Sequence, residues 1–489
     1  MSHPFYDLVV IGSGPAGQKA ALSAAKLGKR VALIDREDSV GGVCIHTGTI
    51  PSKAIREAVL HLTGLRERAV YGSSYSVKQN ITMADLLYRC RQVVQTEVDV
   101  IRGQMSRAGV TMLFGTAAFA DPHTLRVRRE HADGSAADVH EVTGQHILIA
   151  VGTEPARPAG VPFAAGKVID SNGLLDLAEL PRDLAIVGGG VVGTEYACML
   201  AAVGVPVTLV ESRPRLLEFV DDEIAENLQF RLREMGIRLR LNESVDHIAL
   251  RADGLVEATL VSQKRLTCAT LLYAIGRQGA TDGLNLAAAG LSADPRGRLR
   301  VNETYQTDTP HIYAAGDVIG FPALAATSME QGRLAACHMF HEMPSIDGVS
   351  PVFPYGIYTI PEISMVGQTE QALTQAGVPY EVGLARYREI ARGQLIADPH
   401  GLLKLLFHPD SRRLLGVHAI GTGATELIHI GQTVMAAGLP IDYFVESVFN
   451  YPTLAECYKV AALDGVNRVR TASTTSAASD CDNPAAKAA

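Results

Sequence analysis

The chain has 489 residues, of which 47% are hydrophobic and 20% are charged, so it is long enough for about three globular domains. Its 44 basic residues are outnumbered by 52 acidic ones and its pI is near 6.0, which argues against a nucleic-acid-binding protein. The seven cysteines show no CxxC or CxxH spacing, which argues against a disulfide scaffold and a zinc site and predicts that no metal is bound.

The N-terminal segment MSHPFYDLVVIGSG enters an apolar strand within a few residues and has no charged leader or small-residue cleavage site. It therefore does not resemble a signal peptide, and we expect the protein in the cytoplasm. The longest apolar stretch, residues 184–210, is interrupted by Gly188, Gly190 and Pro206 and carries Glu195. A strand, a turn, a helix and a second strand explain this stretch better than a membrane span does.

Residues 7–35 follow the pattern of a strand, a glycine turn, an Ala-rich helix and a second strand that ends in an acid. Gly12 permits the tight turn, Gly14 lets the backbone approach a pyrophosphate, and Gly17 allows the helix to pack closely on the strand. The pyrophosphate would lie at the N-terminus of the helix, where free N–H groups favour anions. Asp35 is placed to hydrogen-bond a ribose hydroxyl, so this unit predicts a dinucleotide site.

The same pattern recurs in residues 183–212, with Gly188, Gly190 and Gly193 in the turn and Glu211 at the end of the second strand. A second strand–helix unit without a ligand is the alternative interpretation. Two complete fingerprints favour two dinucleotides, one held permanently and one that binds and leaves.

A third segment, residues 304–320, has the sequence TYQTDTPHIYAAGDVIG and precedes an Ala-rich stretch. Asp317 follows a strand-like run and stands before a helix, where an acid can bind a polyol chain and the helix N-terminus can face negative charge. A simple helix cap is the alternative for this residue.

Taken together, the order of the motifs resembles that of the pyridine nucleotide–disulfide oxidoreductases over about residues 4–470. The matching segments are the first GxGxxG, GGVCIHTGTIPSK, ILIAVGTEP, the second GxGxxG, YAIGRQG and IYAAGDVIG. The resemblance implies an α/β fold with two Rossmann-like dinucleotide-binding domains, for FAD and for NAD(P), and a C-terminal α+β dimerisation domain. We accordingly expect a homodimer or a larger homo-oligomer.

The resemblance also implies the ligands: a tightly bound, non-covalent FAD, and NAD(H) or NADP(H) as exchanging nucleotides. The residues matched to the FAD site are Gly12, Gly14, Gly17, Asp35, Arg36, Gly41, Gly42, Cys44, Lys53, Ala117, Gly152, Asp317 and Ala325. Those matched to the nicotinamide nucleotide site are Gly188, Gly190, Gly193, Glu211, Arg213 and Gly276.

Members of this family that reduce disulfides use two cysteines and a histidine, and the sequence lacks part of this set. Cys44 is present, but Thr49 stands at the second cysteine position and Tyr451 at the histidine position. A threonine hydroxyl cannot carry electrons, and tyrosine, with a pKa near 10, is a poor base at neutral pH. We expect Cys44 and Glu456 to be structural; the alternative for Cys44 is a low-pKa thiol ahead of a helix that begins near Pro51.

Lys53 and Glu195 are the candidate catalytic residues. The resemblance places the lysine beside the reactive edge of the flavin and pairs it with the glutamate, where it would steady the charge of the reduced flavin. A solvated surface lysine is the alternative.

The segments GTIPSKA, YTIPEIS, ELIHIGQTVM and FNYPTLAECYKVAAL resemble those of the soluble transhydrogenase subfamily. Its members move a hydride reversibly between NADPH and NAD⁺ through the flavin and need no thiol. Glu211 would favour NAD(H) by binding a 2′-hydroxyl, and Arg213 or Arg215 would offset its repulsion of a 2′-phosphate, unless both are solvated. Two other functions stay open: an NAD(P)H-dependent flavoprotein reductase or oxidase that uses a quinone or oxygen, and a non-catalytic flavoprotein redox sensor.

The sequence divides into five predicted segments. They are an FAD-binding part (1–150), an inserted NAD(P)-binding domain (151–278), a second FAD-binding part (279–347), an interface domain (348–470) and a disordered tail (471–489).

Overall fold

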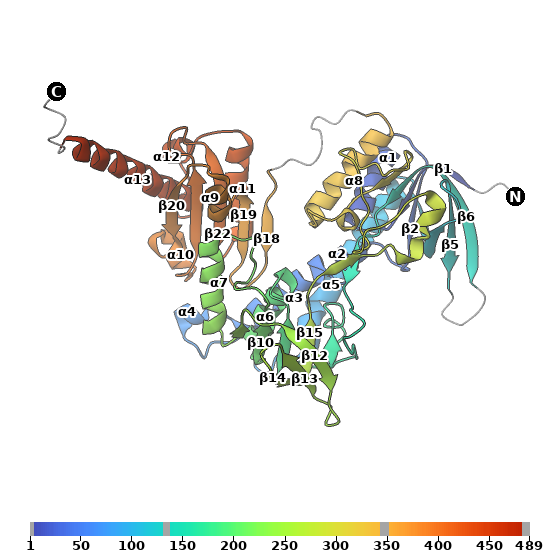
Figure 1. Ribbon diagram of the computed structural model, residues 1–489, viewed down its shortest axis with the longest axis horizontal. Helices are drawn as coiled ribbons and strands as arrows, with labels where there is room; N and C mark the ends of the chain where they lie inside the picture. Colours follow the sequence, from blue (N-terminus) through green and yellow to red (C-terminus); the bar gives the residue numbers. More distant parts are fainter. Residues whose placement is uncertain (1–3, 131–136, 343–351, 482–489) are drawn as a thin grey trace.

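The computed structural model describes residues 4–130, 137–342 and 352–481, and its sheets form three regions (Figure 1). The first region lies at the upper right of the view, the second at the bottom and the third at the upper left. The chain builds most of the first region, crosses into the second, returns to the first and ends in the third.

The first region is a largely parallel sheet in the order β3-β2-β1-β6-β5-β4, with β17 beside the second half of β6. Strand β1 is apolar and fully buried over residues 8–10, as expected for a parallel strand covered on both faces. The strands are β1 (Phe5–Ile11), β2 (Val31–Asp35), β3 (Thr111–Phe114), β4 (Thr116–Phe119), β5 (Thr124–Arg129), β6 (Asp138–Ile149) and β17 (Ile312–Ala314).

Helices cover this sheet, and two of them cross unusually closely. A Cβ on Gly332 in α8 would lie 2.0 Å from the carbonyl oxygen of Ala16 in α1, so only glycine allows this contact. The long helix α5 begins at a capping box in which Thr82 and Asp85 satisfy each other's backbone N–H groups. The helices in this part of the chain are α1 (Pro15–Lys26), α2 (Gly42–His46), α3 (Thr49–Thr63), α4 (Arg68–Tyr71), α5 (Met83–Arg107), α8 (Ala325–Met339) and the 3₁₀ turns η1 (Asp282–Leu284), η2 (Leu286–Ala289) and η3 (Asp317–Ile319). Of these, α4 lies away from the sheet, toward the third region (Figure 1).

The second region is a parallel sheet in the order β11-β10-β9-β15-β8, flanked by an antiparallel sheet β12-β13-β14 and joined to the first region by the β7–β16 ladder. Helix α6 is buried along most of its length, and α7 contacts β22 of the third region. The elements are β7 (Thr153–Pro155), β8 (Val168–Ile169), β9 (Leu184–Val187), α6 (Val191–Ala202), β10 (Val207–Val210), α7 (Asp222–Glu234), β11 (Arg238–Arg240), β12 (Val245–Leu250), β13 (Val256–Leu260), β14 (Arg265–Cys268), β15 (Thr270–Tyr273) and β16 (Arg277–Gly279).

The third region is an antiparallel sheet in the order β18-β19-β22-β21-β20, with helices packed against it. Every side chain of β21 is buried, including that of Lys404. The elements are β18 (Tyr355–Ile357), β19 (Ile363–Gly367), α9 (Glu370–Ala376), β20 (Glu381–Arg386), η4 (Tyr387–Glu389), α10 (Ala391–Leu395), β21 (Leu402–Phe407), β22 (Leu414–Ile420), α11 (Ala424–Ala436), α12 (Asp442–Glu446) and α13 (Glu456–Cys481).

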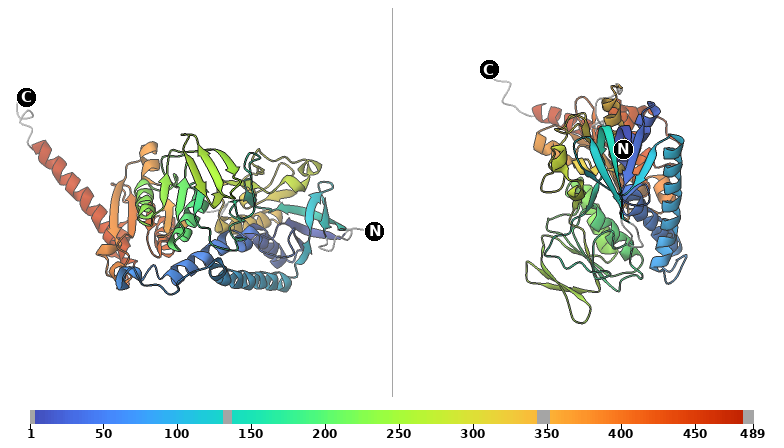
Figure 2. Two further views of the ribbon diagram at one scale, coloured as in Figure 1. Left: turned by 90° about the horizontal axis from the view of Figure 1, so that it is seen from below. Right: turned by 90° about the vertical axis from the view of Figure 1, so that its right-hand side faces the viewer.

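The C-terminal helix corrects one expectation from the sequence. We expected disorder from residue 471, but α13 continues through residues 471–481 and projects from the body of the molecule (Figure 2). A helix that has already formed its first turn gains one hydrogen bond for each added residue, so α13 can continue through a segment that is rich in serine and threonine. Residues 482–489 lie outside the described residues, as does the predicted boundary at 347.

None of the described helices combines the length and the hydropathy that a membrane crossing requires.

Candidate nucleotide-binding and redox site

The first cavity, of about 760 Å³, lies at the carboxyl ends of β1, β2, β6 and β17. Open parallel sheets bind nucleotides at this edge. The predicted residues that line it are Gly12, Gly14, Asp35, Arg36, Gly42, Cys44, Ala117, Gly152, Asp317 and Ala325. Of the described residues around the cavity, Gly17, Gly41 and Lys53 do not reach its wall.

The glycines of the first fingerprint have different structural roles. Gly12 has φ +102°, and a Cβ there would lie 2.4 Å from the carbonyl oxygen of Ala150. Gly14 borders the cavity, and a Cβ there would meet no atom within 4 Å, so a side chain would fill space that a ligand can use. Gly17 serves packing, because its Cβ would lie 1.9 Å from the carbonyl oxygen of Gly12. The backbone N–H of Gly41 donates to Ser13 Oγ at 2.9 Å.

Asp35, at the carboxyl end of β2, and Asp317, just after β17, both face the cavity. Asp35 accepts hydrogen bonds from the backbone N–H and hydroxyl of Ser13. Asp317 lies within 3.4 Å of the hydroxyls of Thr153 and Ser328, both of which sequence reasoning missed. Because both acids keep lone pairs beyond these contacts, they can accept hydrogen bonds from ligand hydroxyls.

The second cavity, of about 580 Å³, lies at the carboxyl ends of β9 and β10. The predicted residues that line it are Gly188, Gly190, Glu211, Arg213 and Gly276. Gly193 is not among the described lining residues, since its Cβ would lie 2.0 Å from the carbonyl oxygen of Gly188 and it serves packing instead. Burial alone raises the pKa of Glu211, but hydrogen bonds from Arg213 and Gly189 bring it below its usual range, so Glu211 is ionised at neutral pH.

A third cavity, of about 1080 Å³, joins the other two. It shares Thr153, Asp317 and Ala323 with the first cavity and Arg277 with the second. Arg277 donates from Nε to Thr153 Oγ1 at 2.8 Å, so this contact links the two nucleotide regions. Two dinucleotides that occupied the first and second cavities could bring their redox-active ends together here.

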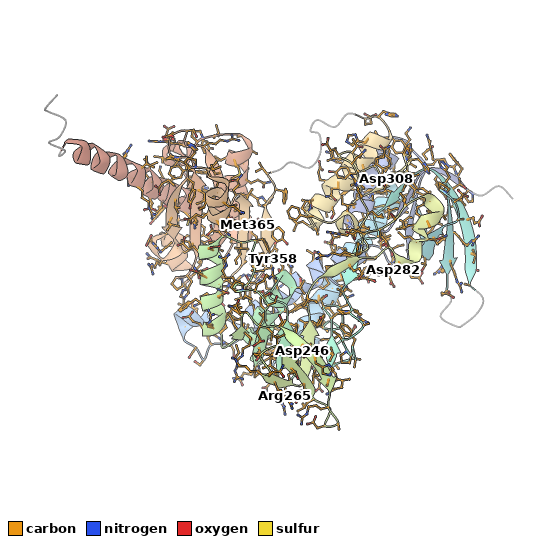
Figure 3. All side chains as sticks on the ribbon, viewed as in Figure 1. Asp246, Arg265, Asp282, Asp308, Tyr358 and Met365 are labelled. Atoms are coloured by element: carbon orange, nitrogen blue, oxygen red, sulfur yellow. The ribbon has the colours of Figure 1, made fainter. Side chains whose placement is uncertain are left out.

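Lys53 and Glu195 form an ion pair between the first and second regions. Lys53 Nζ in α3 lies 2.9 Å and 3.1 Å from the two carboxylate oxygens of Glu195 in α6, and the glutamate side chain is only 5% exposed. The third region completes the site: the backbone N–H of Tyr358 donates to Glu195 Oε1 at 2.8 Å, and Lys53 Nζ lies 4.9 Å from the centre of the Tyr358 ring. Figure 3 shows Tyr358 where the three regions meet. Tyr358 opens the segment YTIPEIS, but the sequence did not identify it as a site residue.

Two family models match this chain: the pyridine nucleotide-disulphide oxidoreductase model over residues 6–332, and the dimerisation domain of the same family over residues 353–462. The chain belongs to the pyridine nucleotide-disulphide oxidoreductase family. Its mixed α/β fold and the order of its regions agree with the fold expected from the sequence.

Relatives within this family match over nearly their whole length. The soluble pyridine nucleotide transhydrogenase of Mycobacterium tuberculosis is 53% identical, over 95% of this chain and 98% of that protein. That of an Enterobacter species is 44% identical, over 96% of this chain and 100% of that protein. A copper(II) complex of the HOCl-induced flavoprotein disulfide reductase RclA from Escherichia coli has a TM-score of 0.84 at 29% identity, over 95% of this chain and 99% of that one.

Cys44 is the one cysteine among the described residues that line the first cavity. Cys44 and Thr49 both line the cavity. Burial raises the pKa of the Cys44 thiol, although a hydrogen bond from the Thr49 side chain acts in the opposite direction. A raised pKa keeps the thiol protonated at neutral pH, which argues against the low-pKa redox thiol considered from the sequence. Helix α3 begins at Thr49, slightly before the expected position near Pro51.

Tyr451, at the histidine position of the disulfide-reducing members of the family, lies in the segment between α12 and α13. Its side chain is 73% exposed on the third region. Glu456 begins α13, and its Oε2 is buried without a hydrogen-bond partner among the described residues. Tyr451 and Glu456 therefore do not form the acid–base pair that disulfide reduction uses.

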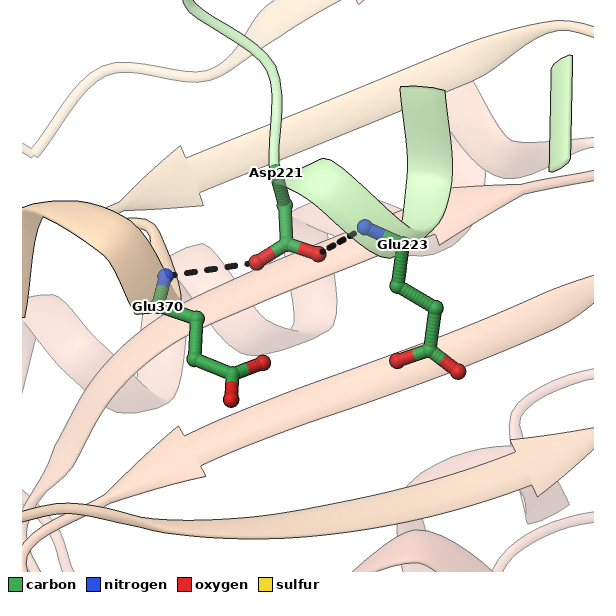
Figure 4. Close-up of side chains that lie close together, drawn as sticks. All are labelled: Asp221, Glu223 and Glu370. Atoms are coloured by element: carbon green, nitrogen blue, oxygen red, sulfur yellow. Dashed lines mark hydrogen bonds between the residues drawn. The ribbon is translucent and has the colours of Figure 1, made fainter. Parts of the chain in front are cut away.

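An acidic cluster joins the second and third regions of this family member. Asp221 accepts hydrogen bonds from the backbone N–H groups of Glu223 and Glu370 (Figure 4). These three carboxylates have the spacing of a cation site, but the ammonium of Lys404, 1% exposed, pairs with all three. The lysine supplies the positive charge that buried carboxylates need.

Proposed function

We propose that this protein is a soluble transhydrogenase that moves a hydride reversibly between NADPH and NAD⁺ through a non-covalently bound FAD. The observation that carries this proposal is the third cavity, which shares wall residues with both of the other cavities, together with a protonated thiol at Cys44 that has a threonine beside it in place of a second cysteine. A site of this kind suits hydride transfer between nucleotides and has no second thiol for dithiol chemistry. The names of the relatives at 53% and 44% identity favour this function over a quinone or oxygen reductase and over a silent sensor.

The first cavity is proposed to hold FAD. Gly14 and the N-terminus of α1 would take the pyrophosphate, Asp35 the adenosine ribose, and Asp317 the polyol chain, with Arg36, Ala117, Gly152 and Ala325 along the wall. FAD held by these residues would supply the hydride-transfer chemistry that links one nicotinamide nucleotide to another. The second cavity is proposed to bind NAD(H) and NADP(H) in turn, with Glu211 and Arg213 at the ribose end.

Lys53 and Glu195 are proposed to act at the junction as an electrostatic pair. The ammonium is held by two carboxylate oxygens and covered by the Tyr358 ring, so its position is fixed before any ligand arrives. A fixed cation in a largely buried site stabilises negative charge that develops next to it without reorganisation.

The protein is also proposed to be a cytoplasmic homodimer or larger homo-oligomer. Support for the oligomer comes from the dimerisation domain matched over residues 353–462. The described cysteines are free thiols, which suits a reducing compartment.

An anaerobic experiment tests the function directly. NADPH is added to the purified protein, and the visible absorbance of the oxidised flavin should bleach. Addition of excess NAD⁺ should then restore it and produce NADH. If NADPH bleaches the flavin but only oxygen or a quinone restores it, the protein is a reductase and not a transhydrogenase.

A further inference from the structure

The acid at the ribose end of the second cavity has no free acceptor in this structure. Glu211 Oε1 accepts from the Ser212 hydroxyl at 3.1 Å and from the backbone N–H and Nε of Arg213, both at 2.9 Å. Its Oε2 accepts from the backbone N–H of Gly189 at 2.6 Å and from Arg213 Nη2 at 3.2 Å. Because a carboxylate oxygen has two lone pairs, a ribose hydroxyl could bind Glu211 only after one donor leaves.

Of these donors, only the guanidinium of Arg213 can free a lone pair on Oε2 without breaking the fold. The backbone N–H groups of Gly189 and Arg213 are fixed by the chain on either side of Glu211, and rotation of the Ser212 hydroxyl would still leave Oε1 with two donors. The Arg213 side chain, in contrast, is 43% exposed and belongs to the wall of the cavity. When it swings away, Glu211 Oε2 keeps one donor and gains a free lone pair for a 2′-hydroxyl.

While the guanidinium of Arg213 is hydrogen-bonded to Glu211, some of its N–H groups remain available to a ligand. Nε and one N–H of Nη2 are used there, which leaves three of its five N–H groups. The nearest other acid is Glu218, 3.7 Å from Nη1, and both side chains of this pair are exposed, so the contact is weak. A 2′-phosphate in the cavity could therefore bind the terminal nitrogens in the bidentate geometry that arginine favours.

Arg215, the second arginine considered from the sequence, points elsewhere. Its Nη1 forms an ion pair with Asp222 at the start of α7, and it is not among the described residues that line the cavity. The two arginines have one residue between them in the sequence, but Arg213 faces the second cavity and Arg215 faces α7.

From this geometry we infer that Arg213 alone allows one site to accept both nucleotides. With NADP(H), its terminal nitrogens hold the 2′-phosphate while Nε still neutralises Glu211. With NAD(H), the guanidinium withdraws and Glu211 Oε2 accepts the 2′-hydroxyl. The inference rests on the proposed function, because it assigns nicotinamide nucleotides to the second cavity.

Binding of NAD⁺ and NADP⁺ to the flavin-loaded protein tests this inference by calorimetry. The two ligands differ only in the 2′-phosphate, and in their oxidised form they cannot reduce the flavin. Arg213→Ala should weaken NADP⁺ binding by about tenfold to a hundredfold, the value of losing hydrogen bonds between charged groups. It should change NAD⁺ binding by less than about threefold, since Glu211 becomes freely available. Arg215→Ala is the matched control and should change neither.

Arg213→Lys keeps the charge without the fork and should fall between the wild type and Arg213→Ala for NADP⁺. Should Arg213→Ala fail to retain flavin, Arg213→Gln replaces it with the same expectation. The inference is overturned if Arg213→Ala weakens both nucleotides equally or neither, or if Arg215→Ala gives the larger loss for NADP⁺. If the wild type binds neither nucleotide, the proposed function fails together with it, whereas normal wild-type binding with an equal loss in Arg213→Ala overturns only the role of Arg213.

Discussion

Glu195→Gln should raise the reduction potential of the bound flavin, because it leaves the positive charge of Lys53 without a counter-charge. Lys53 Nζ now lies 2.9 Å from Glu195 Oε2, at a site where only 5% of the glutamate side chain is exposed. Glutamine keeps the shape of the side chain and the oxygen that accepts from the backbone N–H of Tyr358 at 2.8 Å. The substitution therefore removes a charge and changes the packing little.

The size of the effect follows from the strength of this contact. A hydrogen bond between charged groups contributes about 1.5–3 kcal/mol, and without Glu195 that interaction becomes available to the charge that the flavin gains on reduction. For a two-electron couple, 30 mV corresponds to about 1.4 kcal/mol, so the potential should rise by about 30–60 mV.

Anaerobic titration against dyes of known potential measures this change. Glu57→Gln is the control, because Glu57 lies on the same helix as Lys53 but pairs with Arg56, and its side chain is 44% exposed. Its potential should equal that of the wild type. An unchanged or lower potential in Glu195→Gln would refute the idea that the Lys53–Glu195 pair faces the flavin.

Three further predictions use the thiol position, the ribose end and the acidic cluster. The wild type should take up two electrons per FAD in a dithionite titration. Thr49→Cys places a second thiol against Cys44 and should take up four electrons after air oxidation. Uptake of four electrons by the wild type would reveal a redox centre that the site does not contain. Glu211→Ala should shift the ratio of kcat/KM toward NADP(H) by roughly tenfold, because the guanidinium it now holds is released; an unchanged ratio would show that Glu211 does not face the ribose. Lys404→Met should lower the free energy of unfolding in urea by about 3–5 kcal/mol at pH 7, because it removes the ammonium that pairs with the buried Asp221 and leaves His418, whose pKa is lowered by burial, as a weak replacement. Burial alone raises the pKa of Asp221, but His418 and Lys404 bring it below its usual value, so this difference between wild type and variant should shrink as the pH falls below about 4; a difference that persists in acid would contradict the assignment.

The sequence predicted the fold, and both of its glycine fingerprints border cavities at the carboxyl edges of parallel sheets, because these features depend on local patterns. A glycine turn between an apolar strand and a helix forces the backbone geometry at Gly12 and Gly188, whatever surrounds it. Tyr358, Thr153 and Ser328 were missed because their roles depend on contacts with segments far away in the chain. No periodicity or spacing marks such residues in advance.

Charge neutralisation was equally hidden from the sequence. Lys404 stands in an apolar strand, and only the folded chain shows which acids it meets. Arg213 and Arg215 were indistinguishable as residue types, and the course of the loop after β10 decided which one faces the cavity. The tail prediction erred for residues 471–481 because composition does not reveal a helix that continues from a packed segment.

The cluster of Lys404 with Asp221, Glu223 and Glu370 limits where this enzyme can be joined to segments of its relatives in a chimaera. Asp221 follows the loop that carries Arg213, whereas Lys404 and Glu370 belong to the third region, so the cluster crosses a boundary where chimaeras would naturally be cut. A nucleotide-binding segment grafted from a parent without an acid at this position would leave a buried ammonium with one counter-charge fewer. Exchanges designed to alter nucleotide preference should therefore end before Asp221, or take the strand with Lys404 from the same parent.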